Sequence, residues 1–168
     1  MTSPHQDAPI DFDPNNFLSS FFRTAKAVLF SPRSFYKRME IQGGLQKPFL
    51  FLGCCALFPG CCILVLAATL GLLEQVQIPR VLAILTVVIA FTFVIAGIHY
   101  VIITRLLKAP GTYEMAFRVN AYAAATALFC WIPIPIVVVF LKFYEAYLIT
   151  IGLSRAFSIT LLYLLVRC

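Results

Sequence analysis

The chain has 168 residues, of which 61% are hydrophobic and 12% are charged, and its formal net charge is +6. Soluble domains average roughly 45–50% apolar and about 25% charged residues, so the composition excludes an ordinary soluble domain and indicates an integral membrane protein. The positive charge does not indicate nucleic-acid binding, because no glycine-rich phosphate loop or aromatic-basic array accompanies it. It is the excess of Lys and Arg that cytoplasmic loops carry.

Residues 1–47 form a polar, amphipathic segment ahead of the apolar part of the chain, and nothing in it resembles a cleavable signal. Asn15 or Asn16 is placed to cap a helix that carries Phe17, Phe21 and Phe22 on one face, together with Leu18, Ala25, Val28 and Leu29. Such a helix lies on a membrane surface, and the N-terminus is expected in the cytoplasm.

A second short helix is predicted directly after the first. Ser31 caps it, Pro32 takes its first position, and Gly43-Gly44 ends it. Its Arg33, Lys37 and Arg38 favour anionic headgroups by about 1 kcal/mol each near the surface. The alternative, which stays open from the sequence, is that both helices dock on the cytoplasmic ends of the spans.

Residues 48–168 are predicted to form a transmembrane helical bundle. Residues 48–73 contain no charge, and residues 81–104 contain only His99 as an ionisable group, so both are long enough to cross the hydrocarbon. The short connection 74–80, broken by Pro79, makes them an antiparallel hairpin.

The chain after residue 118 can be divided in two ways. Either 119–141 and 146–166 each cross, with Arg155 buried, or a helix from about Ala116 turns at 131–135 and a second helix runs over 134–153. Charge alone favours the first division. Trp131, Pro133 and Pro135 favour the second, because it places them in a turn at the membrane surface, and the second is adopted here.

This division predicts four full spans, and residues 156–166, about half a span, then form a re-entrant piece, a buried half-helix or a short fifth helix. It also orients the protein, because only Arg80 lies outside and ten basic residues face the cytoplasm. These ten are Arg23, Lys26, Arg33, Lys37, Arg38, Lys47, Arg105, Lys108, Arg118 and Arg155.

Five elements in this order resemble the Yip family of Ypt/Rab-interacting membrane proteins, and its shorter bacterial-type members in particular. They are "VLFSPRSFYKRM", "GGLQKPFLF", "FRVNAYAAA", "WIPI" and "YLITIGLSRAFSIT", and they cover most of residues 26–160. The resemblance implies an all-α bundle of five helices with a cytoplasmic N-terminus. It also implies a trafficking-like role without catalysis, and partners among membrane proteins or other copies of the chain.

Two departures argue against the GTPase binding of the eukaryotic relatives. The "DLYGP" element is missing, and Thr126 stands four residues after Tyr122 where proline is usual. The bacterial cytoplasmic membrane is accordingly favoured over Golgi or ER membranes.

Four polar residues inside the predicted spans are candidates for a functional site: His99, Tyr122, Lys142 and Glu145. Lys142 and Glu145 stand i, i+3 on a helix and are expected to neutralise each other within the bilayer, facing the bundle interior or a water cavity. His99 is placed either to meet Glu145 or to hydrogen-bond between helices, and Tyr122 and Asn120 are expected to link helices.

Cys54, Cys55, Cys61 and Cys62 match no standard metal spacing and are read as packing residues, so no metal or other cofactor is expected. No catalytic set of residues occurs, which predicts a protein that is not an enzyme. The leading hypothesis is a membrane organiser that recruits partners or shapes the bilayer. The alternative is a transport protein for a proton, ion or small solute built on His99, Lys142 and Glu145.

Overall fold

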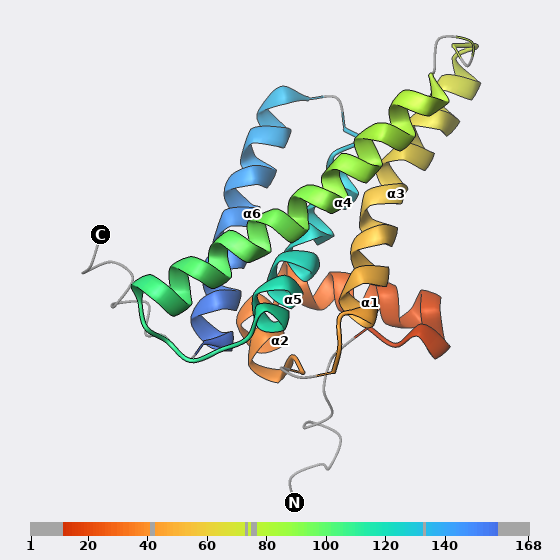
Figure 1. The fold of residues 1–168 in the computed structure, drawn as a ribbon. Coiled ribbons are helices and arrows are strands. Elements are labelled where there is room, and N and C mark those ends of the chain that lie inside the picture. Colours follow the sequence, from red (N-terminus) through yellow and green to blue (C-terminus); the bar gives the residue numbers. More distant parts are fainter. Residues whose placement is uncertain (1–11, 41–42, 73, 75–76, 133, 158–168) are drawn as a thin grey trace, which may run out of the picture.

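A computed structural model describes residues 12–40, 43–72, 74, 77–132 and 134–157, and all regular structure in these residues is helical (Figure 1). The elements in chain order are η1 (Pro14–Asn16), α1 (Phe17–Phe30), α2 (Pro32–Arg38), α3 (Gln46–Thr69), α4 (Ile78–Val101), η3 (Ile102–Leu106), α5 (Tyr113–Ala123), η4 (Ala124–Phe129) and α6 (Pro135–Ala156).

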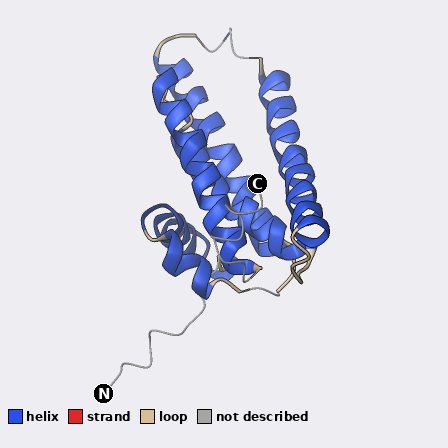
Figure 2. Ribbon diagram, turned by 90° about the vertical axis from the view of Figure 1, so that its left-hand side faces the viewer, coloured by secondary structure: helices blue, strands red, loops and turns tan. Residues whose placement is uncertain are grey.

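The predicted hairpin is present as α3 and α4, which join at the top of Figure 1 and contact each other through residues such as Phe49 and Phe93. Figure 2 shows the bundle turned by 90°, with its described regular structure all helical. Each helix of the hairpin begins two or three residues before the predicted span, and α4 continues through the π-helical turn η3 to Leu106. Within the described residues, three helices are long and apolar enough to cross a membrane: α3, α4 with η3, and α6. Their surfaces are largely exposed and apolar, as lipid contact requires.

The chain between α4 and α6 follows the second division, with a turn near Trp131. A helix ends at Phe129 and the next begins at Pro135, which rules out one continuous helix over 119–141. However, the segment before the turn is shorter than expected: 11 residues of α-helix in α5 are followed by 6 residues of 3₁₀ helix in η4. The expected third full span is therefore absent from the three candidates.

The count of four full spans and a short fifth is accordingly not confirmed. The predicted fifth span begins at Ala156, where α6 ends, and its residues from 158 onward lie outside the described part of the chain.

The position of α5 explains its short length. Every residue from Met115 to Ala123 is buried, because α3, α4, α6 and the N-terminal helices surround this helix. A helix covered by protein on all sides needs neither the length nor the uniformly apolar surface of a membrane span. α5 is thus the central element of the fold.

α1 lies across the lower part of the bundle, and α2 turns back beside α6 (Figure 1). Phe21 of α1 packs against Phe51 of α3, with ring centroids 5.3 Å apart. Tyr144 of α6 donates a hydrogen bond to the Leu29 carbonyl. The docking alternative is therefore correct for the inner face of these helices.

The caps of the N-terminal helices differ from the predicted ones. Neither Asn16 nor Ser31 makes a side-chain cap, and the Asp13 carboxylate instead accepts a hydrogen bond from the Asn15 backbone N–H at 3.0 Å. This hydrogen bond is the main cause that lowers the pKa of Asp13. α2 ends at Arg38, before the two glycines, because Met39 is already extended.

Candidate functional site

Lys142 and Glu145 form the predicted ion pair on α6. Their Nζ and Oε2 atoms lie 2.7 Å apart, as residues one helical turn apart allow. The pair does not face the bundle interior, however: 66% of the Lys142 side chain and 26% of the Glu145 side chain are exposed. Spacing along a helix decides whether two residues pair, but the packing of the helix decides which way the pair faces.

The pair borders a cleft of about 410 Å³ between α4 and α6. Both helices pack on α5, and far less on each other, so α5 and η4 close the cleft at its base with Asn120 and Ala124. The α4 wall is mostly apolar and consists of Val87, Val88, Phe91, Thr92 and Ile95. The cleft is thus an apolar groove between two helices of membrane-crossing length, and two opposite charges lie on its α6 side.

His99 is not part of this ion pair. Its Nδ1 lies 3.2 Å from Oδ1 of Asn120 on α5, while the Asn120 amide donates to the Ala116 carbonyl at 2.7 Å. Of the two predicted roles of His99, contact with Glu145 or a hydrogen bond between helices, the structure shows the second, with Asn120 as the partner. Such bonds contribute about 0.6 to 2 kcal/mol in membrane bundles.

Tyr122 lies in the core, away from the cleft. Its ring contacts Phe35 of α2 and Phe51 of α3, each with centroids 5.2 Å apart. The neighbouring Tyr36 is also buried and donates from its hydroxyl to the Val119 carbonyl at 3.4 Å. Burial raises the pKa of Tyr36, so its hydroxyl stays a neutral donor. Both tyrosines join the N-terminal helices to the bundle.

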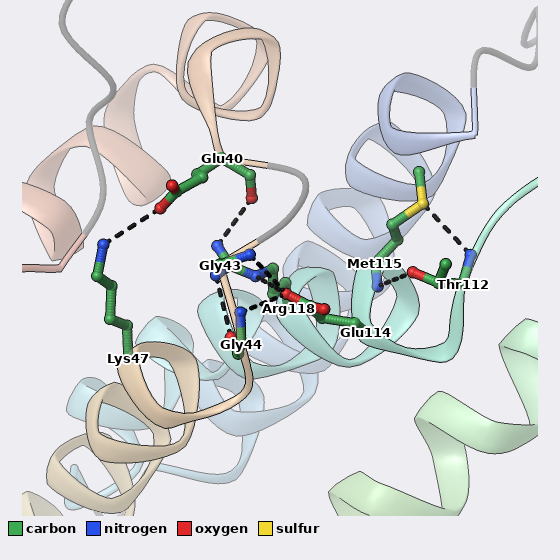
Figure 3. Close-up of polar contacts among 8 residues, drawn as sticks. All are labelled: Glu40, Gly43, Gly44, Lys47, Thr112, Glu114, Met115 and Arg118. Atoms are coloured by element: carbon green, nitrogen blue, oxygen red, sulfur yellow. Dashed lines mark hydrogen bonds and ion pairs between the residues drawn. The ribbon is translucent and has the colours of Figure 1, made fainter.

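The polar cluster around Arg118 (Figure 3) was not predicted from the sequence, which placed Arg118 among the cytoplasmic loop charges. The Arg118 side chain is fully buried on α5. Its two terminal nitrogens donate to the backbone carbonyls of Glu40 at 2.8 Å and Gly44 at 3.0 Å. Its Nε donates to the Glu114 carboxylate at 3.2 Å.

Glu114 completes this cluster from the preceding turn of α5. One of its carboxylate oxygens accepts the backbone N–H groups of Gly43 at 2.9 Å and Gly44 at 2.7 Å. Gly44 has a φ of +80°, which glycine adopts readily. Glu114 and Arg118 therefore fix the connection that leads from α2 into α3. Their i, i+4 spacing was the signal in the sequence that indicated a pair.

The predicted membrane-surface residues fall into two groups. Phe17 and Phe22 are exposed, as are Arg33 and Lys37, whereas Phe21 is buried against α3. Arg38 is partly buried and donates to the Ser34 hydroxyl at 2.8 Å. Phe21 is thus unavailable to lipid. Phe22 lies on the side of α1 away from the core and is uncovered, whereas Phe17 lies on the core side and is exposed in the first turn of the helix.

Cys54, Cys55, Cys61 and Cys62 are free thiols along α3. Among the described residues, no three His, Cys, Asp or Glu side chains are grouped so that they could hold a metal ion.

A family model described as the Yip1 domain matches residues 26–166. The match covers most of the chain and contains the Arg118 cluster, the cleft and α2. Comparisons with curated proteins and with solved structures found no match.

Proposed function

Because the chain belongs to the Yip1 domain family, we propose that it is a non-enzymatic integral membrane protein that organises the bilayer around it and recruits membrane partners. The observation that carries this proposal is the uncovered outer side of α1. Leu18 and Phe22 are exposed there, next to the exposed Arg23 and Lys26. An apolar strip flanked by cations is the composition of a helix that inserts shallowly among anionic lipids.

The docking of α1 makes this insertion effective. Phe21 and Val28 anchor the helix to the bundle, so its depth is set by the spans and not by its own partitioning. A helix that is held across the bundle and displaces headgroups in one leaflet favours a curved or thinned bilayer at that position. The same exposed strip is also the surface that a membrane partner would contact.

The test is reconstitution of the full chain into liposomes that contain anionic lipid, with vesicle diameter measured by electron cryomicroscopy. The double variant Leu18→Ser, Phe22→Ser should leave the vesicles larger and rounder than the parent does. The control is Phe143→Ser, because Phe143 is an exposed phenylalanine on α6 and the change matches Phe22→Ser. Equal vesicle shapes for the parent and the double variant would remove the basis of the proposal.

A transport function is the second candidate, since the Lys142–Glu145 pair borders an open cleft. His99 would have no part in it, because its hydrogen bond is to Asn120. Flux of protons or ions in liposomes that depends on Lys142 and Glu145 would favour this function over the first.

A further inference from the structure

We propose that the cleft between α4 and α6 binds the headgroup of a zwitterionic phospholipid that carries a primary ammonium and a phosphodiester, as ethanolamine lipids do. This proposal does not rest on the membrane-organising function, which depends on α1. It rests on the Lys142–Glu145 pair and on the walls of the cleft.

The ion pair leaves hydrogen-bonding capacity unused. The Lys142 ammonium has three donors and the Glu145 carboxylate has two oxygens, and one donor and one oxygen meet at 2.7 Å. The remaining two donors and the second oxygen have no partner among the described residues. In hydrocarbon such groups are costly unless a ligand or water satisfies them.

The position of the pair selects the class of ligand. Lys142 lies seven residues beyond Pro135, which is about 10 Å along the helix. Because α6 has membrane-crossing length, the cleft opens sideways onto the bilayer. The molecules that reach it first are therefore lipids. The volume of the cleft is within the range of roughly 300–1,000 Å³ that is typical of ligand sites.

The charges select the headgroup. A phosphodiester accepts from the Lys142 ammonium, and a primary ammonium donates to the free Glu145 oxygen. A choline headgroup has no N–H to donate, and an anionic glycerol headgroup brings no cation to Glu145. The acyl chains would follow Val87 and Phe91, which are more than half exposed and line the α4 wall.

The experiment measures which lipid the full chain retains. The protein is purified in detergent and mixed with equal amounts of ethanolamine, choline and glycerol phospholipids that have the same acyl chains. Bound lipids are counted by native mass spectrometry after dilution. The parent should retain the ethanolamine lipid about tenfold over the choline lipid, a ratio that one charge-assisted hydrogen bond can supply.

Two variants test the location of the bound lipid. The double variant Lys142→Leu, Glu145→Leu removes both charges, and Ala146→Phe fills the cleft while it leaves the pair in place. Both should lose the preference. The matched control is Ala90→Phe, because Ala90 is an exposed alanine of α4 outside the cleft lining, and this variant should keep the preference.

The exchange variant Lys142→Glu, Glu145→Lys should also keep the preference, because it presents the same two charges. Should the double leucine variant fail to fold, Ala146→Phe decides the outcome. Equal retention of the three lipids by the parent would overturn the proposal. So would a preference for the glycerol lipid, or a preference that survives in Ala146→Phe.

Discussion

Replacing Arg118 with methionine should be among the most destabilising single changes in the chain. The substitution keeps an unbranched apolar stem but removes a fully buried guanidinium, which donates to Glu114, Glu40 and Gly44 among the described residues. Glu114 then loses its cationic partner, and the carbonyls of Glu40 and Gly44 lose their donors. Among the described contacts, the connection into α3 would keep the two N–H groups that donate to Glu114 and the Lys47–Glu40 ion pair.

The expected cost follows from this geometry. Breaking a buried ion pair by removing one partner costs about 3–5 kcal/mol, because the other charge is left uncompensated. The Glu114 side chain is 27% exposed, so water partly solvates it in the variant. We therefore expect a loss near the lower end, about 3 kcal/mol in the free energy of unfolding.

The assay is reversible unfolding in mixed micelles, followed by far-ultraviolet circular dichroism. Glu114→Gln is the companion variant, because its amide oxygen still accepts from Gly43 and Gly44 while its charge is gone. The double variant Arg118→Met, Glu114→Gln should cost less than the sum of the two single changes, since no unpaired carboxylate remains. A parent-like stability of Arg118→Met, within about 0.5 kcal/mol, would refute the account of the cluster.

Three further predictions concern packing and topology. Phe21→Ser should lower the free energy of unfolding by about 3 kcal/mol or more in the same assay, and Phe22→Ser should lower it by much less, because of these two only Phe21 is buried. Equal losses would contradict the docking of α1. Gly152→Ala should destabilise the protein in the same assay, because an added Cβ at Gly152 would lie 2.5 Å from Cγ1 of Val119. Gly53→Ala should not, because an added Cβ there meets nothing within 4 Å. A more stable Gly152→Ala variant would mean that α5 and α6 pack less closely. A single cysteine at Phe143, in a chain without its other cysteines, should resist water-soluble thiol reagents from either side of sealed vesicles, because α6 places it within the bilayer; fast labelling would contradict that placement.

Hydropathy and helix breakers could locate most of the helices. Long uncharged runs define α3 and α4, because lipid-facing helices need an apolar surface all round. Trp131 and Pro135 mark the start of α6, because neither is easily placed in the middle of a span. These signals are local in the sequence, so they can be interpreted without knowing which helices pack against each other.

The division of the α1 surface could not be read in this way. Phe21 and Phe22 are adjacent and equally apolar, and both fall on one broad face of the helix. Only the position of Phe51 on α3 decides that Phe21 turns inward. Likewise, the spacing of Lys142 and Glu145 predicts their pairing, whereas their exposure depends on α4 and α6 separating around α5.

α5 shows why the remaining features escaped prediction. Hydropathy and the positive-inside rule assume that a polar residue beside an apolar run lies at a membrane boundary, and that assumption made Arg118 a loop charge. A helix enclosed by protein can carry such residues wherever other segments satisfy them. Arg118 is satisfied by the connection before α3, and Asn120 by His99 of α4. Because these partners lie 21 to 78 residues away in the chain, the burial of Arg118 is a property of the assembled bundle, and α5 can form as a buried helix only once its neighbours are in place.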